Sequence, residues 1–345
     1  MAQVNIDNEP FNNEVDREIE LIADEDFDSD RSDVGRSMEL STKSVSSSIF
    51  DHRFENGRTY HKYKDGKYML PNDEVELDRL DLQHHLFRLT FEGRLGNAPP
   101  IDENAKVGRV LDLGTGTGIW AIEYGYEHPE AEVLGVDLSP TQPSFTAPNV
   151  IFEIDDVEEP WTYTRRFDYI HSRMMNSNIS DWDVYVKRCF DNLNPGGYLE
   201  LNECDIAPAS DDGTLREDSA ISESVRLLQQ ASEMFGRPFK PMNELKSVLI
   251  KAGFVDVVMN QYKWPTNDWP LEPRFKEIGR WSNGNLSSGW EAVCLANLTR
   301  AHNWTREEVL IFMEKCHWEF SDRRIHAYLS IWSAYGRKPA TPEKD

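Results

Sequence analysis

The sequence has few cysteines, and the four that it has follow none of the usual metal or redox patterns. They are Cys189, Cys204, Cys294 and Cys316. No two of them form a C-x-x-C pair, and none has zinc-like spacing with a histidine. We therefore expect free thiols and no metal site.

Long apolar runs and targeting segments are also missing. No stretch approaches the roughly 18 apolar residues that span a bilayer. The start, "MAQVNIDNEPFNNE", lacks the basic end and the apolar core of a signal peptide. These absences predict a cytoplasmic protein with no membrane partner.

Basic residues are too few to balance the acidic ones. There are 37 Lys and Arg against 61 Asp and Glu, and the formal net charge is -24. Such a charge repels the phosphate backbone of nucleic acids, and no cluster of Lys or Arg offsets it. We expect no direct nucleic-acid partner.

Part of this charge lies in an arm at the start of the chain. The first 34 residues hold twelve acidic residues and two arginines, and the serine-rich "SVSSSIF" follows at 44–50. Because this composition buries little apolar surface, we predict that residues 1–50 are disordered. Val15, Ile19 and Ile22 have helical spacing, so a short partner-binding helix is the alternative.

The rest of the chain, 51–345, is predicted to be a single α/β domain. Its apolar segments alternate between strand and helix, and the short connections between them indicate a parallel sheet with right-handed crossovers. We expect a final strand, antiparallel to its neighbour, at 324–336. The other expected strands are 107–114, 131–138, 150–156, 167–175, 196–205 and 255–264, and the expected helices are 119–128, 182–193 and 241–254.

Three further segments are expected to form a helical cap. An amphipathic helix is predicted within 71–93, before the first strand of the sheet, as part of a cap segment at 59–93. The segments 207–240 and 265–323 exceed what the sheet needs, and both contain helical patterns. Insertions that follow strands in open α/β sheets commonly cover the crevice at the strand ends.

A glycine-rich stretch, "VLDLGTGTGIW", joins the first expected strand to the first expected helix. The dinucleotide fingerprint G-x-G-x-x-G, counted from Gly114, requires a glycine at the position of Ile119. A P-loop would continue as Gly-Lys-Ser/Thr, whereas Gly118 is followed by Ile119 and Trp120. An NAD-linked dehydrogenase and a phosphate-binding loop are therefore disfavoured.

The pattern D-x-G-x-G-x-G, starting at Asp112, is instead that of the nucleoside loop of S-adenosyl-L-methionine (AdoMet)-dependent methyltransferases. AdoMet has no phosphate and needs close approach of the backbone, which Gly114, Gly116 and Gly118 permit. Its carboxylate can lie near the positive end of the following helix.

The next two strands end in residues that suit the nucleoside. Asp137, nineteen residues after Gly118, is placed to accept both ribose hydroxyls, and Leu138 to cover one face of the adenine. The third strand ends in "EIDDVEEPW", where Asp156 can accept from the adenine amino group and Val157 can contact the ring.

Catalytic residues are harder to assign, because methyl transfer needs a general base only where the acceptor must lose a proton. His171, at the end of the fourth strand, is the first candidate to face the methyl group; a structural histidine is the alternative. Of His84 and His85, only one can point inward from a helix. Glu203 is either a carboxylate near the acceptor or a residue that faces solvent.

The sequence closely resembles the fungal LaeA-like (TAM-domain, UMTA-type) methyltransferases over about 59–339. The motifs that carry the resemblance are "YHKYKDGKYMLPNDEVELDRLDLQHHLF", "VLDLGTGTGIWAIEYGYEHPEAEVLGVDLSPTQP", "FEIDDVEEPWTYTRRFDYIHSRMM", "LNPGGYLELNE", "SDDGT" and "IHAYLSIWSAYGRKP". The acidic arm matches no motif of that family.

The resemblance implies a class I methyltransferase fold, Rossmann-like, with a seven-stranded, mostly parallel sheet and an antiparallel last strand. It also implies AdoMet binding through Asp112, Gly114, Gly116, Gly118, Asp137 and Asp156. The family includes tailoring enzymes of secondary metabolism and regulators that associate with velvet proteins. We therefore expect a methyltransferase with a small-molecule acceptor. The alternative is a regulator with a velvet-type protein partner. For such a regulator, a nuclear location is possible in place of the cytoplasm.

Overall fold

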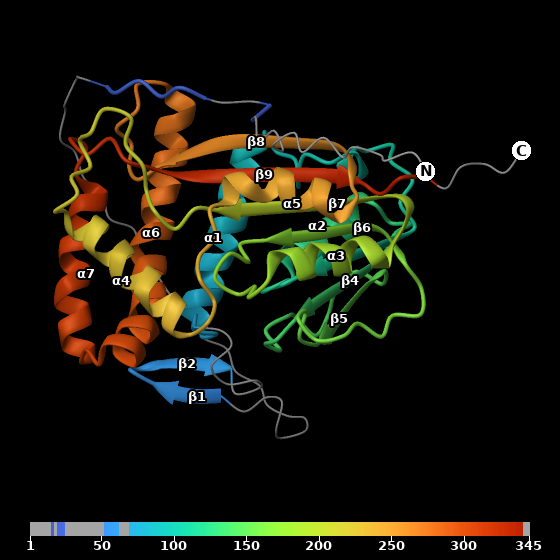
Figure 1. Cartoon of the computed structure of the whole chain (residues 1–345), viewed down its shortest axis with the longest axis horizontal. Coiled ribbons are helices and arrows are strands. Elements are labelled where there is room, and N and C mark those ends of the chain that lie inside the picture. Colours follow the sequence, from blue (N-terminus) through green and yellow to red (C-terminus); the bar gives the residue numbers. More distant parts are fainter. Residues whose placement is uncertain (1–14, 17–18, 25–51, 62–68, 341–345) are drawn as a thin grey trace, which may run out of the picture.

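A seven-stranded sheet forms the centre of the computed structural model, which describes residues 15–16, 19–24, 52–61 and 69–340 (Figure 1). The strand order is β5-β4-β3-β6-β7-β9-β8. β9 runs antiparallel to both of its neighbours, and the other six strands run in one direction. The strands are β3 (Arg109–Leu113), β4 (Glu132–Asp137), β5 (Val150–Ile154), β6 (Phe167–Arg173), β7 (Leu193–Cys204), β8 (Val255–Pro265) and β9 (Tyr328–Arg337). This confirms the predicted sheet and its antiparallel last strand.

Helices cover both faces of the sheet. Figure 1 shows α3 (Trp182–Asn192) and α5 (Leu245–Ala252) in front of the strands and α2 (Ile119–Glu127) behind them. The central strands are buried on both faces, which explains the nearly continuous apolar runs "VLDL" and "VLGV". Short 3-10 turns lie at Pro99–Ile101 and Met242–Glu244.

The predicted cap segments contain four helices, which share a hydrophobic core with parts of β8 and β9. They are α1 (Glu74–Thr90), α4 (Ala220–Met234), α6 (Pro273–His302) and α7 (Arg306–Ser321). Local signals set their ends: Asp73 caps α1 by accepting from the Glu76 N–H (3.1 Å), and Thr305 and Glu308 form a capping box on α7. None of the helices in the described ranges is long and apolar enough to cross a membrane.

A hairpin that we did not predict precedes the cap. It consists of β1 (His52–Glu55) and β2 (Arg58–His61), which pair in an antiparallel manner. Asn56 and Gly57 connect the strands with φ angles of 53° and 82°. An Asn-Gly pair is a strong hairpin signal, so this element was readable from the sequence.

Residues 15–16 and 19–24 of the acidic arm contact the body, so the prediction of disorder is wrong for these residues. The N–H of Asp16 donates to the carbonyl of Met259 on β8 (2.8 Å), and its carboxylate accepts from the Met259 N–H (2.9 Å). Val15 and Ile19 pack against the hydrophobic core. An edge strand has unpaired backbone groups, and here the arm satisfies some of them.

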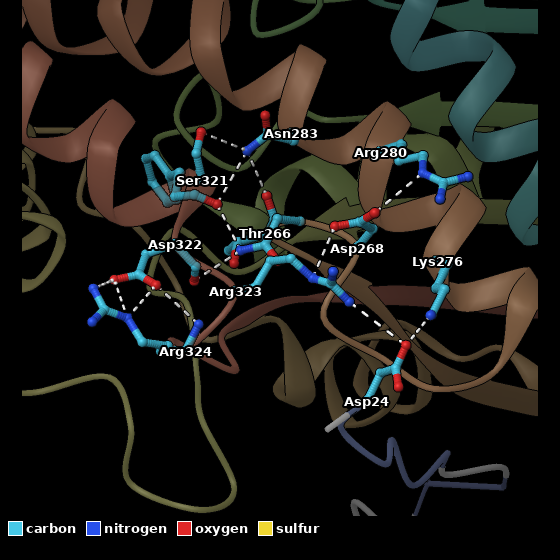
Figure 2. Close-up of polar contacts among 12 residues, drawn as sticks. Asp24, Thr266, Asp268, Lys276, Arg280, Asn283, Ser321, Asp322, Arg323 and Arg324 are labelled. Carbon is cyan, nitrogen blue, oxygen red and sulfur yellow. Dashed lines mark hydrogen bonds and ion pairs between the residues drawn. The ribbon is translucent and has the colours of Figure 1, made fainter. Parts of the chain in front are cut away.

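Farther along the arm, Asp24 lies between Lys276 of α6 and Arg323, which follows α7 (Figure 2). The described part of the arm is not helical, so the alternative of a helix through Val15, Ile19 and Ile22 is also wrong for these residues. The rest of the predicted arm lies outside the described residues.

Candidate functional site

A cavity lies at the carboxyl ends of the strands, between the glycine-rich loop and the cap. It is lined from the sheet side by residues 114–117 and 119, 137–138, 155–158, 173–178 and 203–206. From the cap it is lined by residues of α1 and α6 and by Phe239, and Leu329 at the start of β9 adds to the lining. Five consecutive connections after strands therefore meet in one place, as expected for an open α/β sheet.

The glycine-rich loop lies tightly against its neighbours. Gly114, Gly116 and Gly118 all have positive φ angles, of 69°, 58° and 80°. The N–H of Gly116 donates to Oδ2 of Asp137 (2.8 Å), and a Cβ on Gly116 would come within 3.3 Å of Leu80 on α1. A side chain at Gly116 would therefore combine backbone strain with crowding.

Asp137 ends β4 and is bound by two backbone donors. Besides Gly116, the N–H of Ser139 donates to its Oδ1 (2.9 Å). Burial raises the pKa of Asp137 to about 6, although these backbone donors lower it. Each carboxylate oxygen has a second lone pair, so the group can still accept from a diol such as the ribose of AdoMet.

Six of the eight predicted cofactor residues line the cavity. They are Gly114, Gly116, Asp137, Leu138, Asp156 and Val157. Asp156 is 3% exposed and accepts from the N–H of Glu158 (3.0 Å). These side chains fit a nucleoside. Carboxylates, which accept hydrogen bonds, follow two neighbouring strands, and an apolar side chain adjoins each of them.

The other two predicted residues support the loop from behind. Gly118 is the N-cap of α2, and a Cβ there would come within 2.5 Å of the Phe152 ring. Asp112 is 3% exposed, and its Oδ2 accepts from the hydroxyl of Thr115 (2.6 Å). These positions shape the loop without lining the cavity.

His171 does not face the cavity. Its Nδ1 lies 2.7 Å from Oδ1 of Asp112, and its ring stacks on Trp120 with centroids 3.8 Å apart. Asn202 approaches Nε2 at 3.3 Å, and the histidine is 1% exposed. This placement does not support His171 as the base and favours the structural alternative.

The neighbouring helix α1 contributes residues whose roles the sequence left open. His84 is 3% exposed and its Nε2 lies 3.0 Å from Glu123, whereas His85 is exposed, so one of the two points inward as predicted. Gln83 and Arg79 line the cavity. Arg173, at the end of β6, lines it as well.

Glu203 is buried, so the alternative that its side chain faces solvent is wrong. Its Oε2 accepts from the N–H groups of Met175 (2.8 Å) and Asn176 (3.0 Å). Oε1 is buried and has no hydrogen-bond partner in the described part of the chain. Burial raises the pKa of Glu203 to about 8, although the two backbone donors lower it.

Apolar side chains line the part of the cavity nearest the cap. They are Met174, Ile206, Phe239, Leu286, Trp290, Val293 and Leu329. The indole N–H of Trp290 donates to the hydroxyl of Ser224 on α4 (2.9 Å), which satisfies its polar atom inside the cap. Within the described residues, no cluster of His, Cys, Asp and Glu is arranged to hold a metal ion.

Comparison with known proteins identifies the family. A family model described as a methyltransferase domain matches residues 82–258. The chain belongs to this methyltransferase family. Its strand order and directions are those of class I methyltransferases, and the methyl donor of the family is AdoMet.

The methyltransferase is similar to fungal proteins over most of its length. "Methyltransferase pytC" of Aspergillus terreus is 39% identical over 300 residues, which are 87% of this chain and 92% of that protein. "Secondary metabolism regulator LAE1" of Cochliobolus heterostrophus is 39% identical over 291 residues, 83% of this chain and 94% of that protein. A solved phosphoethanolamine N-methyltransferase 2 from Haemonchus contortus has a TM-score of 0.43 and 20% identity, covering 69% of this chain and 50% of that one.

Proposed function

We propose that this methyltransferase methylates a small, largely apolar molecule of fungal secondary metabolism. The observation that carries the proposal is one cavity that joins the glycine-rich loop and Asp137 to an apolar region under the cap. An apolar cavity suits a small acceptor, because burial of such a molecule is favourable. The similarity to a fungal protein named a methyltransferase agrees with this.

Residues at the ends of β4 and β5 would hold the nucleoside of AdoMet. In this proposal Asp137 accepts the two ribose hydroxyls, Asp156 accepts from the adenine amino group, and Leu138 and Val157 cover the ring. When bound, AdoMet supplies a methyl group on a positively charged sulfur that is already a good leaving group. The chain then has to position the acceptor, which can supply several kcal/mol of rate acceleration.

We propose no general base for this site. His171 is enclosed behind the glycine-rich loop, and Glu203, with a pKa of about 8, is mostly protonated at neutral pH. Only the minor ionised fraction of such a carboxyl can accept a proton from a phenol or an amine. The proposed chemistry therefore relies mainly on orientation of the acceptor relative to the methyl group.

The first test is to incubate the protein with methyl-labelled AdoMet and a fungal metabolite extract, followed by mass spectrometry. We expect a labelled small molecule, and micromolar binding of S-adenosylhomocysteine. Asp137→Ala should weaken that binding roughly a hundredfold, because charge-assisted hydrogen bonds are lost, and Glu203→Ala should weaken it far less. Equal losses would contradict the site assignment, and absence of binding by the wild type would contradict the function.

A regulatory role is the second candidate, favoured by the similarity to LAE1 and to the "Secondary metabolism regulator laeA" of Aspergillus flavus, 36% identical over 290 residues. In this case the methyltransferase body would serve mainly to bind a velvet-type protein, with the acidic arm as part of the contact. Co-purification with such a protein that is lost on deletion of residues 1–50 would favour it. We place the enzyme in the cytoplasm and the regulator in the nucleus.

A further inference from the structure

The cavity contains a cation that no carboxylate of the described residues pairs with. Three arginines line it. Arg79 pairs with Glu76 at 2.7 Å, and Arg237 pairs with Glu158 at 2.6 Å. Arg173 alone among the three has no carboxylate within ion-pair distance in the described part of the chain.

Two residues of α1 hold the guanidinium of Arg173. Its Nη1 lies 3.3 Å from Nδ1 of His84, and its Cζ lies 4.8 Å from the centre of the Phe87 ring. Because an arginine only donates, Nδ1 of His84 must accept, and Nε2 then carries the hydrogen toward Glu123 (3.0 Å). Burial and the charge of Arg173 both lower the pKa of His84, against the effect of Glu123, which agrees with a neutral ring.

Among the described residues, this arrangement leaves most of the donors of Arg173 without a hydrogen-bond partner. A guanidinium has five N–H donors, and the hydrogen bond to His84 uses one of them. Burial lowers the pKa of Arg173 to about 10, although the carboxylates of Asp112, Glu123 and Asp81, beyond ion-pair distance, raise it. The group is therefore still charged at neutral pH. A charge that is taken out of water is costly unless it meets an opposite charge. The opposite charge expected here is a group on a ligand in the cavity.

The order of the strand ends indicates which group this is. Asp156 follows β5, Asp137 ends β4, the glycine-rich loop follows β3 and Arg173 ends β6, and these four strands are neighbours in that order. Adenine, ribose, sulfur and amino acid follow one another in the same order along AdoMet. The amino-acid end would therefore lie at β6 when the nucleoside lies at β4 and β5.

We propose that Arg173 binds the α-carboxylate of the methionine end of AdoMet. Arginine suits this role because its planar fork matches a carboxylate with two parallel hydrogen bonds. His84 and Phe87 hold the fork in place before the ligand arrives. The assignment rests on the proposed function, since it requires AdoMet in this cavity.

The test compares AdoMet with decarboxylated AdoMet, which keeps the ammonium group and lacks the carboxylate. Calorimetric titration of the wild type should show at least roughly tenfold tighter binding of AdoMet. Arg173→Met should weaken AdoMet binding roughly tenfold to a hundredfold and leave decarboxylated AdoMet nearly unchanged, so the preference disappears. Arg173→Lys keeps the charge but loses the planar fork. This variant should retain part of the preference for AdoMet over decarboxylated AdoMet.

Arg237→Met is the matched control, because it removes the same charge from a cavity arginine that already has a carboxylate partner. It should keep the wild-type preference for AdoMet. Equal weakening of both ligands by Arg173→Met, or an unchanged preference, would overturn the assignment. If Arg173→Met does not fold, the wild type alone gives the test: equal affinities for AdoMet and decarboxylated AdoMet would overturn the assignment. A wild type that binds neither ligand would overturn the proposed function and this assignment with it.

Discussion

Nδ1 of His171 lies 2.7 Å from Oδ1 of Asp112, and both side chains are shielded from solvent. The pair joins β6 to β3 directly beneath the glycine-rich loop, where Asp112 also accepts from the hydroxyl of Thr115. The acidic residue of the D-x-G-x-G-x-G pattern, Asp112, therefore forms hydrogen bonds with other side chains of the protein, and His171 is one of these partners.

Replacement of His171 should consequently affect stability more than chemistry. His171→Asn leaves a buried carboxylate with one partner fewer, so we expect the free energy of unfolding to fall by about 1–3 kcal/mol. The pH dependence of methyl transfer should stay as in the wild type. Urea denaturation and a pH–rate profile measure the two effects. A loss of rate of several hundredfold, with unchanged stability and unchanged S-adenosylhomocysteine affinity, would instead identify a catalytic base.

Cofactor affinity should depend on pH through Asp137. Its pKa is raised to about 6 in the free protein. In the proposed binding mode, the ribose hydroxyls would donate to the ionised carboxylate. Binding therefore favours the ionised form, so affinity should be constant above about pH 7 and fall below pH 6 by up to about tenfold per pH unit. Titration calorimetry between pH 5 and 8 measures this.

Asp137→Asn is the control for this pH dependence. The amide cannot ionise, so the variant should bind more weakly at neutral pH and show little change with pH. A variant that retains the wild-type pH dependence would show that another group is responsible.

Protein stability should depend on pH through Glu203. Its pKa is raised from 4.5 to about 8, so the stability that this group contributes is fully present below about pH 4.5 and is lost as the pH rises through 8. Glu203→Gln resembles the neutral carboxyl and cannot ionise. We expect the variant to be more stable than the wild type at pH 8.5 by about 1 kcal/mol or more, with the difference shrinking toward pH 5. Urea denaturation at several pH values measures it, and a constant difference would contradict the assignment.

The contacts of residues 19–24 with the body should limit local unfolding of this part of the arm. Asp24 contacts Lys276 and Arg323 (Figure 2). The N–H of Leu271 donates to the carbonyl of Ile22 (2.7 Å). Asp24→Asn removes the charge that holds this segment, so amide exchange of Leu271 should become about fivefold faster, as for a loss of about 1 kcal/mol.

Asp268→Asn is the matched control for the arm. Asp268 also contacts Arg323 (3.3 Å), and it contacts Arg280 (3.3 Å), but it lies outside the arm. The exchange rate of Leu271 should change little in this variant. Equal acceleration in both variants would mean that the arginine network as a whole, rather than Asp24, holds the arm.

The sheet, and the meeting of six predicted residues at one cavity, were predictable because their signals are local. Apolar runs mark the buried strands, and the glycine pattern requires its own backbone geometry at Gly114, Gly116 and Gly118. Asp137 and Asp156 follow consecutive strands, and the carboxyl ends of parallel strands meet at one edge. Local patterns were sufficient for these residues.

The remaining features depend on contacts between distant residues. The alternation of a strand places His171 on one face but does not reveal that Asp112, 59 residues earlier, faces it. Arg173 meets His84 across 89 residues, and Glu203 is buried because the loop after β6 covers it. The arm docks because the edge of β8 is unpaired, which no property of the arm itself indicates.

The most direct test of the account is to fill the apolar part of the cavity without touching the nucleoside end. Val293 of α6 lines that part, and Val293→Trp adds bulk there; Ile311→Trp adds the same indole on the exposed surface of α7. With methyl-labelled AdoMet and a fungal extract, the wild type and Ile311→Trp should label a small molecule. Val293→Trp should bind S-adenosylhomocysteine normally and label nothing. Equal labelling by Val293→Trp, or no labelled small molecule from a wild type that binds AdoMet, would contradict the account.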